Sequence, residues 1–390
     1  MRILFSGTPA FGHLLPLLPL ERAARAAGHR TAVLTHPSMA DALAPTAVVP
    51  AGPTLEAVMT EVHRRTGADA ATDMSPGTAG EFFGGARVDL GAEEALAAAE
   101  AFAPDLVVAE SADFLGPLVA ARLGVPWVSH AVGIAIEAPL AEAMKAAAVR
   151  RMRDRGIEPT EPVASVDPWP ACLQRDNWEP SADRIALRSS AHEEESEPAA
   201  WTRPEFPGRD HLPRVLVTLG TIVDEPDTLA AIVASLAGQE VNAIVAVNPA
   251  SGTDSLVVDA SRAHVVGFVP MSLLLDGVDV VVSSGGAGTV LASLSSGIPM
   301  VVLPKGLDKP LNAERATATG AALTVTGPGE VGAAVARVLA ESSFFAAATT
   351  TSELIAGART PEDVLTLLLE RASTTTTTAT ASAPAPTPAH

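Results

Sequence analysis

Cysteine is almost absent from the chain, and this excludes two kinds of site. The sequence contains a single cysteine, Cys172. One thiol can form neither an internal disulfide nor a cysteine-cluster metal site. We therefore interpret Cys172 as a buried thiol without a function of its own.

Basic residues are scarce as well. The 390 residues include 26 Lys and Arg against 45 Asp and Glu, which gives a net charge of −19 and a pI near 4.8. An acidic surface repels a phosphate backbone, and no basic patch offsets the charge. The composition excludes nucleic acid as a partner and indicates a solvated acidic surface.

Long apolar runs are also missing. No run reaches the roughly 18 residues that a membrane-spanning helix needs. The apolar start, ILF at residues 3–5, leads at once into a glycine turn and lacks the basic end and cleavage site of a signal peptide. We expect a cytoplasmic protein without a membrane span.

An alternation of strand-like and helix-like segments fills most of the chain. Its length and its 47% hydrophobic content suffice for two or three domains. Apolar strand candidates lie at residues 2–6, 30–35, 105–110 and 125–130. Such alternation predicts a parallel sheet with helices on both faces. Residues 66–84 lack periodicity and are predicted to form a long loop.

The pattern is interrupted once and then restarts. Residues 187–213 are charged and rich in proline, which is typical of a linker. We predict an α/β protein with two Rossmann-like domains, residues 1–205 and 206–372, that face each other across a cleft. We expect ligands at the carboxyl ends of the strands and the last helix packed back on the first domain. Residues 373–390 are of low complexity and predict a disordered tail.

Two glycine turns share part of the spacing of known phosphate-binding motifs. GTPAFGH, residues 7–13, has P-loop spacing but continues with His13 and Leu14 where Lys and Ser/Thr are needed, so it does not support an ATPase. GGAGT, residues 285–289, is followed by Leu291 where a dinucleotide fingerprint has its third glycine. This second turn still joins a strand to a helix start, which presents backbone N–H groups to an anion.

His13 is the candidate general base. A neutral imidazole near pH 7 accepts a proton readily, and this turn faces the predicted cleft. Considered alone, a histidine at a helix start could equally have no role. Glu110 and Asp113 follow the strand DLVVA at the same end of the sheet, and either could orient the imidazole.

Several segments together resemble a known family. They are GHLLPLLPLERAARAAGH, DLVVAESADFLGPLVAARLGVPWV, VLVTLGT, VVGFVPM and GGAGTVLASLSSGIPMVVLPKGLDKPLNAERA. The chain resembles the nucleotide-sugar glycosyltransferases that decorate macrolides, aromatic polyketides and other natural products, which have the GT-B fold. The resemblance covers most of residues 1–370.

The resemblance implies a role for each matching position. His13 would deprotonate an acceptor hydroxyl, with Glu110 as its acidic partner and Asp113 as the near alternative. The donor would bind through two glycine turns, a strand-edge element that meets the nucleobase and an element near the sugar and phosphates. The residues implied for donor binding are Thr218, Gly220, Thr221, Val269, Ser284, Gly285, Gly286, Gly288, Thr289, Asp308, Lys309 and Asn312. The reaction would be inverting, with a dTDP-sugar as the expected donor and with no metal or bound cofactor.

Two positions depart from the family pattern. Ser284 stands where histidine usually precedes the Gly-Gly pair, and Lys309 stands where glutamine is usual. A charged hydrogen bond contributes about 1.5–3 kcal/mol and a neutral one about 0.5–1.5 kcal/mol. Donor binding should therefore be weaker by about tenfold unless Lys309 or Lys305 supplies the charge. The departures also motivate one alternative, a non-catalytic accessory or binding protein. A third and less favoured alternative is a sugar-nucleotide isomerase or epimerase on the same fold.

The acceptor side is less well specified. Phe11, Phe82 and Phe83 are predicted to bind a small-molecule acceptor, although Phe82 and Phe83 could equally be ordinary core residues. The chain has no tyrosine, 10 Phe and 4 Trp, so we do not expect a stacking platform of several aromatic rings. The oligomeric state is left open, a homodimer included.

Overall fold

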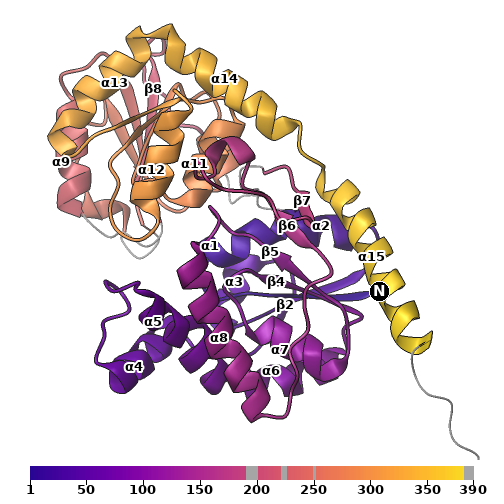
Figure 1. The fold of residues 1–390 in the computed structure, drawn as a ribbon. Helices are drawn as coiled ribbons and strands as arrows, with labels where there is room; N and C mark the ends of the chain where they lie inside the picture. The colour runs from indigo at the N-terminus through magenta and orange to yellow at the C-terminus, as the bar shows by residue number, and fades with distance from the viewer. Residues whose placement is uncertain (190–200, 221–225, 249–251, 382–390) are drawn as a thin grey trace, which may run out of the picture.

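The chain forms two α/β domains, each built on one parallel sheet (Figure 1). The computed structural model describes residues 1–189, 201–220, 226–248 and 252–381. Within these residues the N-terminal sheet has seven strands in the order β3-β2-β1-β4-β5-β6-β7. Its strands are β1 (Arg2–Ser6), β2 (Arg30–Thr35), β3 (Val48–Pro50), β4 (Leu106–Glu110), β5 (Trp127–His130), β6 (Ser165–Asp167) and β7 (Arg184–Ala186).

The C-terminal sheet repeats the same plan. In the described residues it has six parallel strands in the order β10-β9-β8-β11-β12-β13. They are β8 (Arg214–Thr218), β9 (Asn242–Ala246), β10 (Ala263–Val266), β11 (Val280–Ser283), β12 (Met300–Val302) and β13 (Ala322–Thr324). The prediction of two parallel-sheet α/β domains is confirmed.

Helices cover both faces of each sheet, so the central strands are buried throughout and read as continuous apolar runs. The N-terminal domain contains α1 (Phe11–Leu14), η1 (Leu15–Leu17), α2 (Leu18–Ala26), η2 (Pro37–Met39), α3 (Ala40–Leu43), α4 (Leu55–Thr66), α5 (Pro76–Ala79), η3 (Gly80–Ala86), α6 (Arg87–Phe102), α7 (Leu115–Leu123), α8 (Ala138–Asp154) and η4 (Ala171–Leu173). The later helices are α9 (Pro226–Leu236), η5 (Thr253–Ser255), α10 (Met271–Leu274), α11 (Ala287–Ser295), α12 (Lys309–Ala318), η6 (Pro328–Glu330), α13 (Val331–Ala340), α14 (Ser342–Ala356) and α15 (Pro361–Ala381).

The predicted long loop over residues 66–84 is wrong in its second half. Only the stretch between α4 and α5 is a loop; α5 then leads into η3, a π-helix that continues as α6. The glycines that suggested a loop instead allow close packing on α8. A Cβ at Gly84 would lie 2.2 Å from the carbonyl oxygen of Met144, and one at Gly80 would lie 3.0 Å from that of Ala143.

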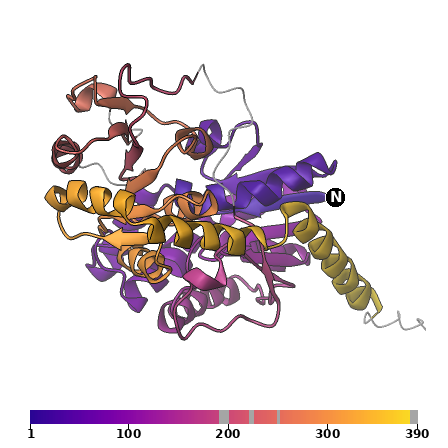
Figure 2. The ribbon, with the colours of Figure 1, turned by 90° about the horizontal axis from the view of Figure 1, so that it is seen from above.

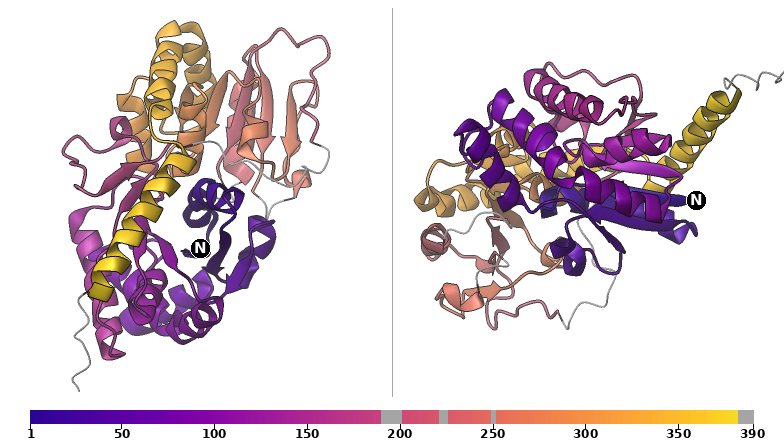
Figure 3. Two further views of the ribbon diagram at one scale, coloured as in Figure 1. Left: turned by 90° about the vertical axis from the view of Figure 1, so that its right-hand side faces the viewer. Right: turned by 90° about the horizontal axis from the view of Figure 1, so that it is seen from below.

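The last helix returns to the N-terminal domain. Figures 1 and 3 show α14 along the C-terminal domain and α15 along the N-terminal one, where it lies beside α2. Val364, Leu365 and Leu368 of α15 are buried in a core cluster with Leu17 and Leu18. The chain thus passes to the second domain between β7 and β8 and returns to the first between α14 and α15.

The predicted disordered tail begins too early. Helix α15 continues to Ala381 and extends beyond the two sheets (Figure 2). Extending a helix that is already formed costs little once its first turns are docked. The hydroxyls of Ser373 and Thr374 also donate to the carbonyls of Leu369 and Glu370, which satisfies these polar side chains on the helix. Residues 382–390 lie outside the described residues.

In the described part of the chain, no single helix is long and apolar enough to cross a bilayer. The helices Pro328–Ala340 and Ser342–Ala356 reach that length and hydropathy only together, and the chain bends sharply between them.

The docking of α15 can be tested with two leucines. Leu368 is fully buried, and Leu354 of α14 is 58% exposed. Leu368→Ala should lower the free energy of unfolding by about 2–5 kcal/mol, because it opens a cavity in the core. Leu354→Ala, the same chemical change on the surface, should change it by less than about 0.5 kcal/mol. Guanidinium denaturation measures both, and equal midpoints for the two variants would contradict the docking.

Candidate active site

The two sheets share a topology that creates a ligand crevice at a defined place. In each, the strand order reverses between two central strands, β1 and β4 in the first domain and β8 and β11 in the second. Open parallel sheets bind ligands at the carboxyl ends of such strand pairs. The predicted base and acid follow β1 and end β4, and the predicted glycine turns follow β8 and β11. The candidate site therefore lies where these four strand ends meet.

The two domains approach each other at these strand ends. The rings of Phe11, in α1, and Phe268, after β10, have centroids 5.6 Å apart. A Cβ at Gly133, which follows β5, would lie 3.6 Å from the Cβ of Ala287 at the start of α11. The His13 turn and the GGAGT turn consequently belong to one interdomain region.

His13 contacts Glu110 directly. The Nδ1 atom of His13 lies 2.9 Å from Oε1 of Glu110. The Glu110 side chain is fully buried, and the His13 side chain is 26% exposed. Glu110 also accepts hydrogen bonds from the Thr8 hydroxyl at 2.9 Å and from the backbone N–H of Ala112 at 2.7 Å. The carboxylate is therefore fixed, and it fixes the imidazole.

The pair shifts both pKa values away from their ordinary range. Burial alone would lower the pKa of His13, but the charge of Glu110 and the hydrogen bond to it outweigh burial and raise that pKa above 6.5. Burial would likewise raise the pKa of Glu110, yet the His13 charge and its hydrogen bonds hold that pKa below its ordinary value. An ionised Glu110 can only accept a hydrogen bond, so Nδ1 of His13 carries the proton and donates it to Glu110. In the neutral ring, Nε2 is therefore the atom that can accept a proton.

Asp113, the alternative partner for His13, contacts a different residue. Its Oδ1 accepts from the guanidinium of Arg87 at 2.8 Å, and its Oδ2 accepts from the Ser6 hydroxyl and from the Gly116 N–H. The structure therefore places Glu110, and not Asp113, against the imidazole. Arg87 has no sequence motif around it and was missed.

His130 is a second histidine that the sequence analysis missed. It lies beside Glu110 in the register of β5 on β4 and is fully buried. Its Nδ1 donates to the carbonyl of Ala131 at 2.7 Å. Burial lowers the pKa of His130 to about 4, so the ring is neutral at pH 7. Only its position next to a strand-end acid could have indicated it.

The predicted acceptor residues divide between core and cleft. Phe82 and Phe83 of η3 are 6% and 9% exposed and belong to a core cluster. The Phe83 ring nevertheless lies beside His13, with centroids 6.0 Å apart, and contacts Phe82 edge-on at 4.8 Å. Phe11 pairs with Phe268, so four of the ten phenylalanines gather near the base. Phe268 was not predicted, and this grouping exceeds what the low aromatic content suggested.

The GGAGT turn has the geometry of an anion site. Gly286 precedes α11 in an extended conformation, and the first turn of this helix carries neither a capping side chain nor an acidic residue. Gly285 has φ +85°, a conformation that favours glycine. Gly288 and Thr289 lie in the first turn of α11, whose N–H groups and dipole favour a negative charge.

Ser284 points away from this turn. It is 2% exposed, and its hydroxyl donates to the carbonyl of Leu219 at 2.8 Å. The preceding Ser283 accepts a hydrogen bond from the Gly285 N–H at 3.1 Å. The Ser284 hydroxyl thus links the turns after β8 and β11, and its proton is committed to the Leu219 carbonyl rather than to an anion.

The remaining residues predicted for donor binding lie around the same turns. The side-chain amide of Asn312 donates to the Gly285 carbonyl at 3.0 Å and to Asp308 at 2.8 Å. Lys309, the first residue of α12, is 7% exposed and packs against Gly285.

Two further predicted positions lie beside these turns. Thr218 ends β8 and accepts from the Gly220 N–H at 3.2 Å. Val269 lies between β10 and α10, next to Phe268, and packs against the core. Thr221 lies outside the described residues.

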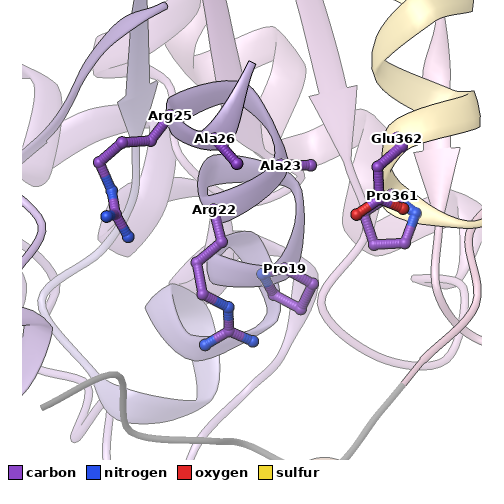
Figure 4. Close-up of a pocket in the computed structure, with 7 residues that line it drawn as sticks. All are labelled: Pro19, Arg22, Ala23, Arg25, Ala26, Pro361 and Glu362. Carbon is purple, nitrogen blue, oxygen red and sulfur yellow. The ribbon is translucent and has the colours of Figure 1, made fainter. Parts of the chain in front are cut away.

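Other features of the described chain lie away from these strand ends. A surface depression of about 420 Å³ lies between α2 and the start of α15 (Figure 4). It is lined by Arg22 and Arg25 on one side and by Pro361 and Glu362 on the other, and by no predicted site residue. The described residues contain no group of three or more His, Cys, Asp or Glu side chains that could hold a metal ion.

Comparison with known proteins agrees with this geometry. The chain matches the family described as Erythromycin biosynthesis protein CIII-like, with the N-terminal domain at residues 22–220 and the C-terminal domain at 230–370. An L-demethylnoviosyl transferase from Streptomyces niveus is 30% identical, over 83% of this chain and 85% of its own length. Elloramycin glycosyltransferase ElmGT from Streptomyces olivaceus is 28% identical, over 93% of this chain and 96% of its own.

Solved structures show the same two-domain arrangement. The glycosyltransferase SsfS6 of Streptomyces sp. SF2575, complexed with thymidine diphosphate, is 29% identical with a TM-score of 0.78 and covers 95% of this chain and 99% of its own. SnogD from Streptomyces nogalater has a TM-score of 0.79 at 24% identity, over 95% of this chain and 99% of its own, which speaks for the fold alone. The chain therefore belongs to the Erythromycin biosynthesis protein CIII-like family and is a glycosyltransferase of the antibiotic-biosynthesis type, with the GT-B fold.

Proposed function

We propose that the protein transfers a sugar, a deoxysugar in particular, from a dTDP-sugar to a hydroxyl of a small natural product, with inversion at the anomeric carbon. The observation that carries this proposal is the 2.9 Å contact between His13 and the buried Glu110 at the carboxyl edge of the first sheet. An imidazole oriented in this way by a carboxylate is arranged to act as a general base. The GGAGT turn of the second domain provides the anion site that the donor needs.

The proposed step is a single displacement. The Nε2 atom of His13 takes the proton of the acceptor hydroxyl while Glu110 stabilises the imidazolium. The acceptor oxygen forms a bond to the anomeric carbon as the bond from that carbon to the diphosphate oxygen breaks. The electron pair leaves with the nucleoside diphosphate, and attack from the opposite face inverts the configuration.

The leaving group is proposed to bind the main chain rather than a metal. The N–H groups of Gly286, Gly288 and Thr289 and the dipole of α11 would stabilise the diphosphate. Ser284 adds nothing to this role because its proton is donated to Leu219. Lys309 and Lys305 would supply the positive charge instead. The chain has only three lysines, and two of them are Lys305, between β12 and α12, and Lys309, the first residue of α12.

The choice of dTDP rests on a relative. SsfS6, 29% identical, is known in complex with thymidine diphosphate. Val269 and its neighbours after β10 would meet the thymine through main-chain atoms.

The alternative, a non-catalytic accessory or binding protein, is weaker. Its motivation was the loss of histidine at position 284 and of glutamine at position 309. The His13–Glu110 pair is nevertheless complete in its contacts, and a protein that only binds would not require it.

Removal of the base tests the catalytic assignment. His13→Ala should reduce transfer by about 10²- to 10⁴-fold, the usual contribution of a general base, while dTDP affinity stays unchanged. The assay uses dTDP-glucose as donor and 4-methylumbelliferone as a phenolic probe acceptor, with other hydroxylated acceptors in parallel. Transfer that survives in this variant would contradict the role of His13.

The pH dependence provides a second test of the base. Only neutral His13 accepts a proton, so kcat/KM should rise with pH through the raised pKa of this residue. Glu110→Gln removes the charge that raises that pKa, so the acidic limb of the profile should move to lower pH and kcat should fall. A limb that does not move would show that Glu110 does not act on the base.

The lysine substitution is tested on the donor side. Lys309→Met should raise the Kd of dTDP by about tenfold, because a charged hydrogen bond to phosphate is lost. Lys145→Met, at an exposed lysine on the other domain, is the matched control and should change nothing. Ser284→Ala should leave the Kd within about threefold, since its hydroxyl is directed elsewhere. Calorimetry with dTDP, UDP, GDP and ADP measures these values, and a tenfold loss in Ser284→Ala would reassign that serine.

A further inference from the structure

A buried ion pair lies behind the His13 turn and takes no part in the proposed reaction. The Arg87 and Asp113 side chains are 1% and 0% exposed, and their closest atoms are 2.8 Å apart. We propose that Arg87 is a positioning residue for the base, which acts with Asp113 to join the Phe82–Phe83 helix to the His13 turn. This inference rests on the proposed function, because it assumes that His13 is the base.

Arg87 connects two parts of the site that are distant in sequence. It is the first residue of α6, directly after η3, the helix that carries the two phenylalanines. Its Nη2 donates both to Asp113 at 2.8 Å and to the carbonyl of Gly7 at 3.1 Å. Gly7 begins the GTPAFGH turn. One guanidinium group therefore contacts the turn that carries His13, and its own residue directly follows the helix that carries Phe82 and Phe83.

Asp113 completes the link from the other side. Its Oδ2 accepts from the hydroxyl of Ser6, the last residue of β1, and from the N–H of Gly116. A Cβ at Gly116 would lie 2.9 Å from the Cβ of Ser6, so only glycine allows this close approach of α7 to the end of β1. Asp113 thereby holds Ser6 and Arg87 holds Gly7. His13 follows six residues after Gly7, in the helix that this turn leads into.

The two charges also oppose each other at the imidazole. The charged groups that act on His13 are Glu110, Arg87 and Asp113. The Arg87 charge lowers the pKa of His13, and the Asp113 charge raises it. His130, behind Glu110, is neutral at pH 7 because its pKa lies at about 4. Removing the Arg87 charge should therefore raise the pKa of His13, and removing the Asp113 charge should lower it. Packing contacts alone would not produce shifts of opposite sign.

A buried ion pair is a poor means of stabilising a core. Two charges lose their hydration, and apolar residues of similar volume often do as well or better. In this pair one nitrogen, Nη1 of Arg87, has no hydrogen-bond partner among the described residues. Positioning of the turn, rather than stability, accounts for its presence.

An NMR titration of the His13 imidazole tests the inference without any substrate. The His13 resonance is assigned by its loss in His13→Ala. In Asp113→Asn the pKa of His13 should fall, because Arg87 remains charged beside it. In Arg87→Lys it should stay near the wild-type value, because the charge is kept. A wild-type pKa in Asp113→Asn, or a large shift in Arg87→Lys, would overturn the electrostatic part of the proposal.

The positioning part is tested by rate. Arg87→Lys keeps the charge but loses the planar fork, so kcat with dTDP-glucose and 4-methylumbelliferone should fall by about ten- to a hundredfold, as expected for a small misplacement of the base. The Kd of dTDP should not change. Arg337→Lys, at a 56% exposed arginine paired with Glu341, is the matched control and should keep full activity. Full activity in Arg87→Lys would overturn the positioning role.

A double variant covers the case in which Asp113→Asn does not fold. Arg87→Met with Asp113→Leu removes both charges and fills the space with apolar groups. Transfer should still fall, whereas the pKa of His13 should return toward that of the wild type. Wild-type transfer in this variant would overturn the inference. Failure of the proposed function has a separate readout, since it would appear as retained transfer in His13→Ala.

Discussion

The buried carboxylate of Glu110 is the interaction on which the rest of the site depends. A charge removed from water must be paired and hydrogen-bonded, or it does not remain a charge. Here Thr8, Ala112 and His13 provide the partners. The Thr8 and His13 contacts require the GTPAFGH turn to wrap over the end of β4, and this in turn requires β1 and β4 to be neighbours. The orientation of the base therefore follows from the strand order together with one buried acid.

The second sheet has the same reversal of strand order, but its strand ends favour a bound negative charge instead of carrying one. Where the first domain buries a carboxylate at its strand ends, the second offers backbone N–H groups after β11 and a helix start free of acidic residues. A proton acceptor and an anion site thus belong to the two facing edges. Helix α15 packs in the core of the first domain although it follows the last helix of the second. The chain consequently connects the two domains twice, once before the second domain and once after it.

Local sequence patterns were sufficient to predict the fold and part of the site. The rest of the site depends on contacts between residues that are far apart in the sequence. The glycine turns and the His13 turn follow apolar strands, and Glu110 ends one, so periodicity and turn chemistry locate them. The choice between Glu110 and Asp113 needed a side-chain direction, which depends on Arg87 at the start of a different helix. The hydroxyl of Ser284 bonds to Leu219, 65 residues earlier, and no local pattern contains that contact. Residues 76–84 were wrongly predicted to be a loop because glycine is common both in loops and where helices pack closely.

The serine at position 284 is best understood through these same contacts. If serine had replaced histidine only by neutral drift, its hydroxyl would not be expected to make a specific contact. Instead, the hydroxyl bonds to the Leu219 carbonyl and so links the turns after β8 and β11. The two buried ionic pairs of the first domain argue in the same direction. Each carries a desolvation cost that apolar residues would avoid, and a homologue without catalytic function would have no need of either. Their retention, with Lys309 beside the glycine turn, favours a donor site whose positive charge has moved to another residue over one that has been lost.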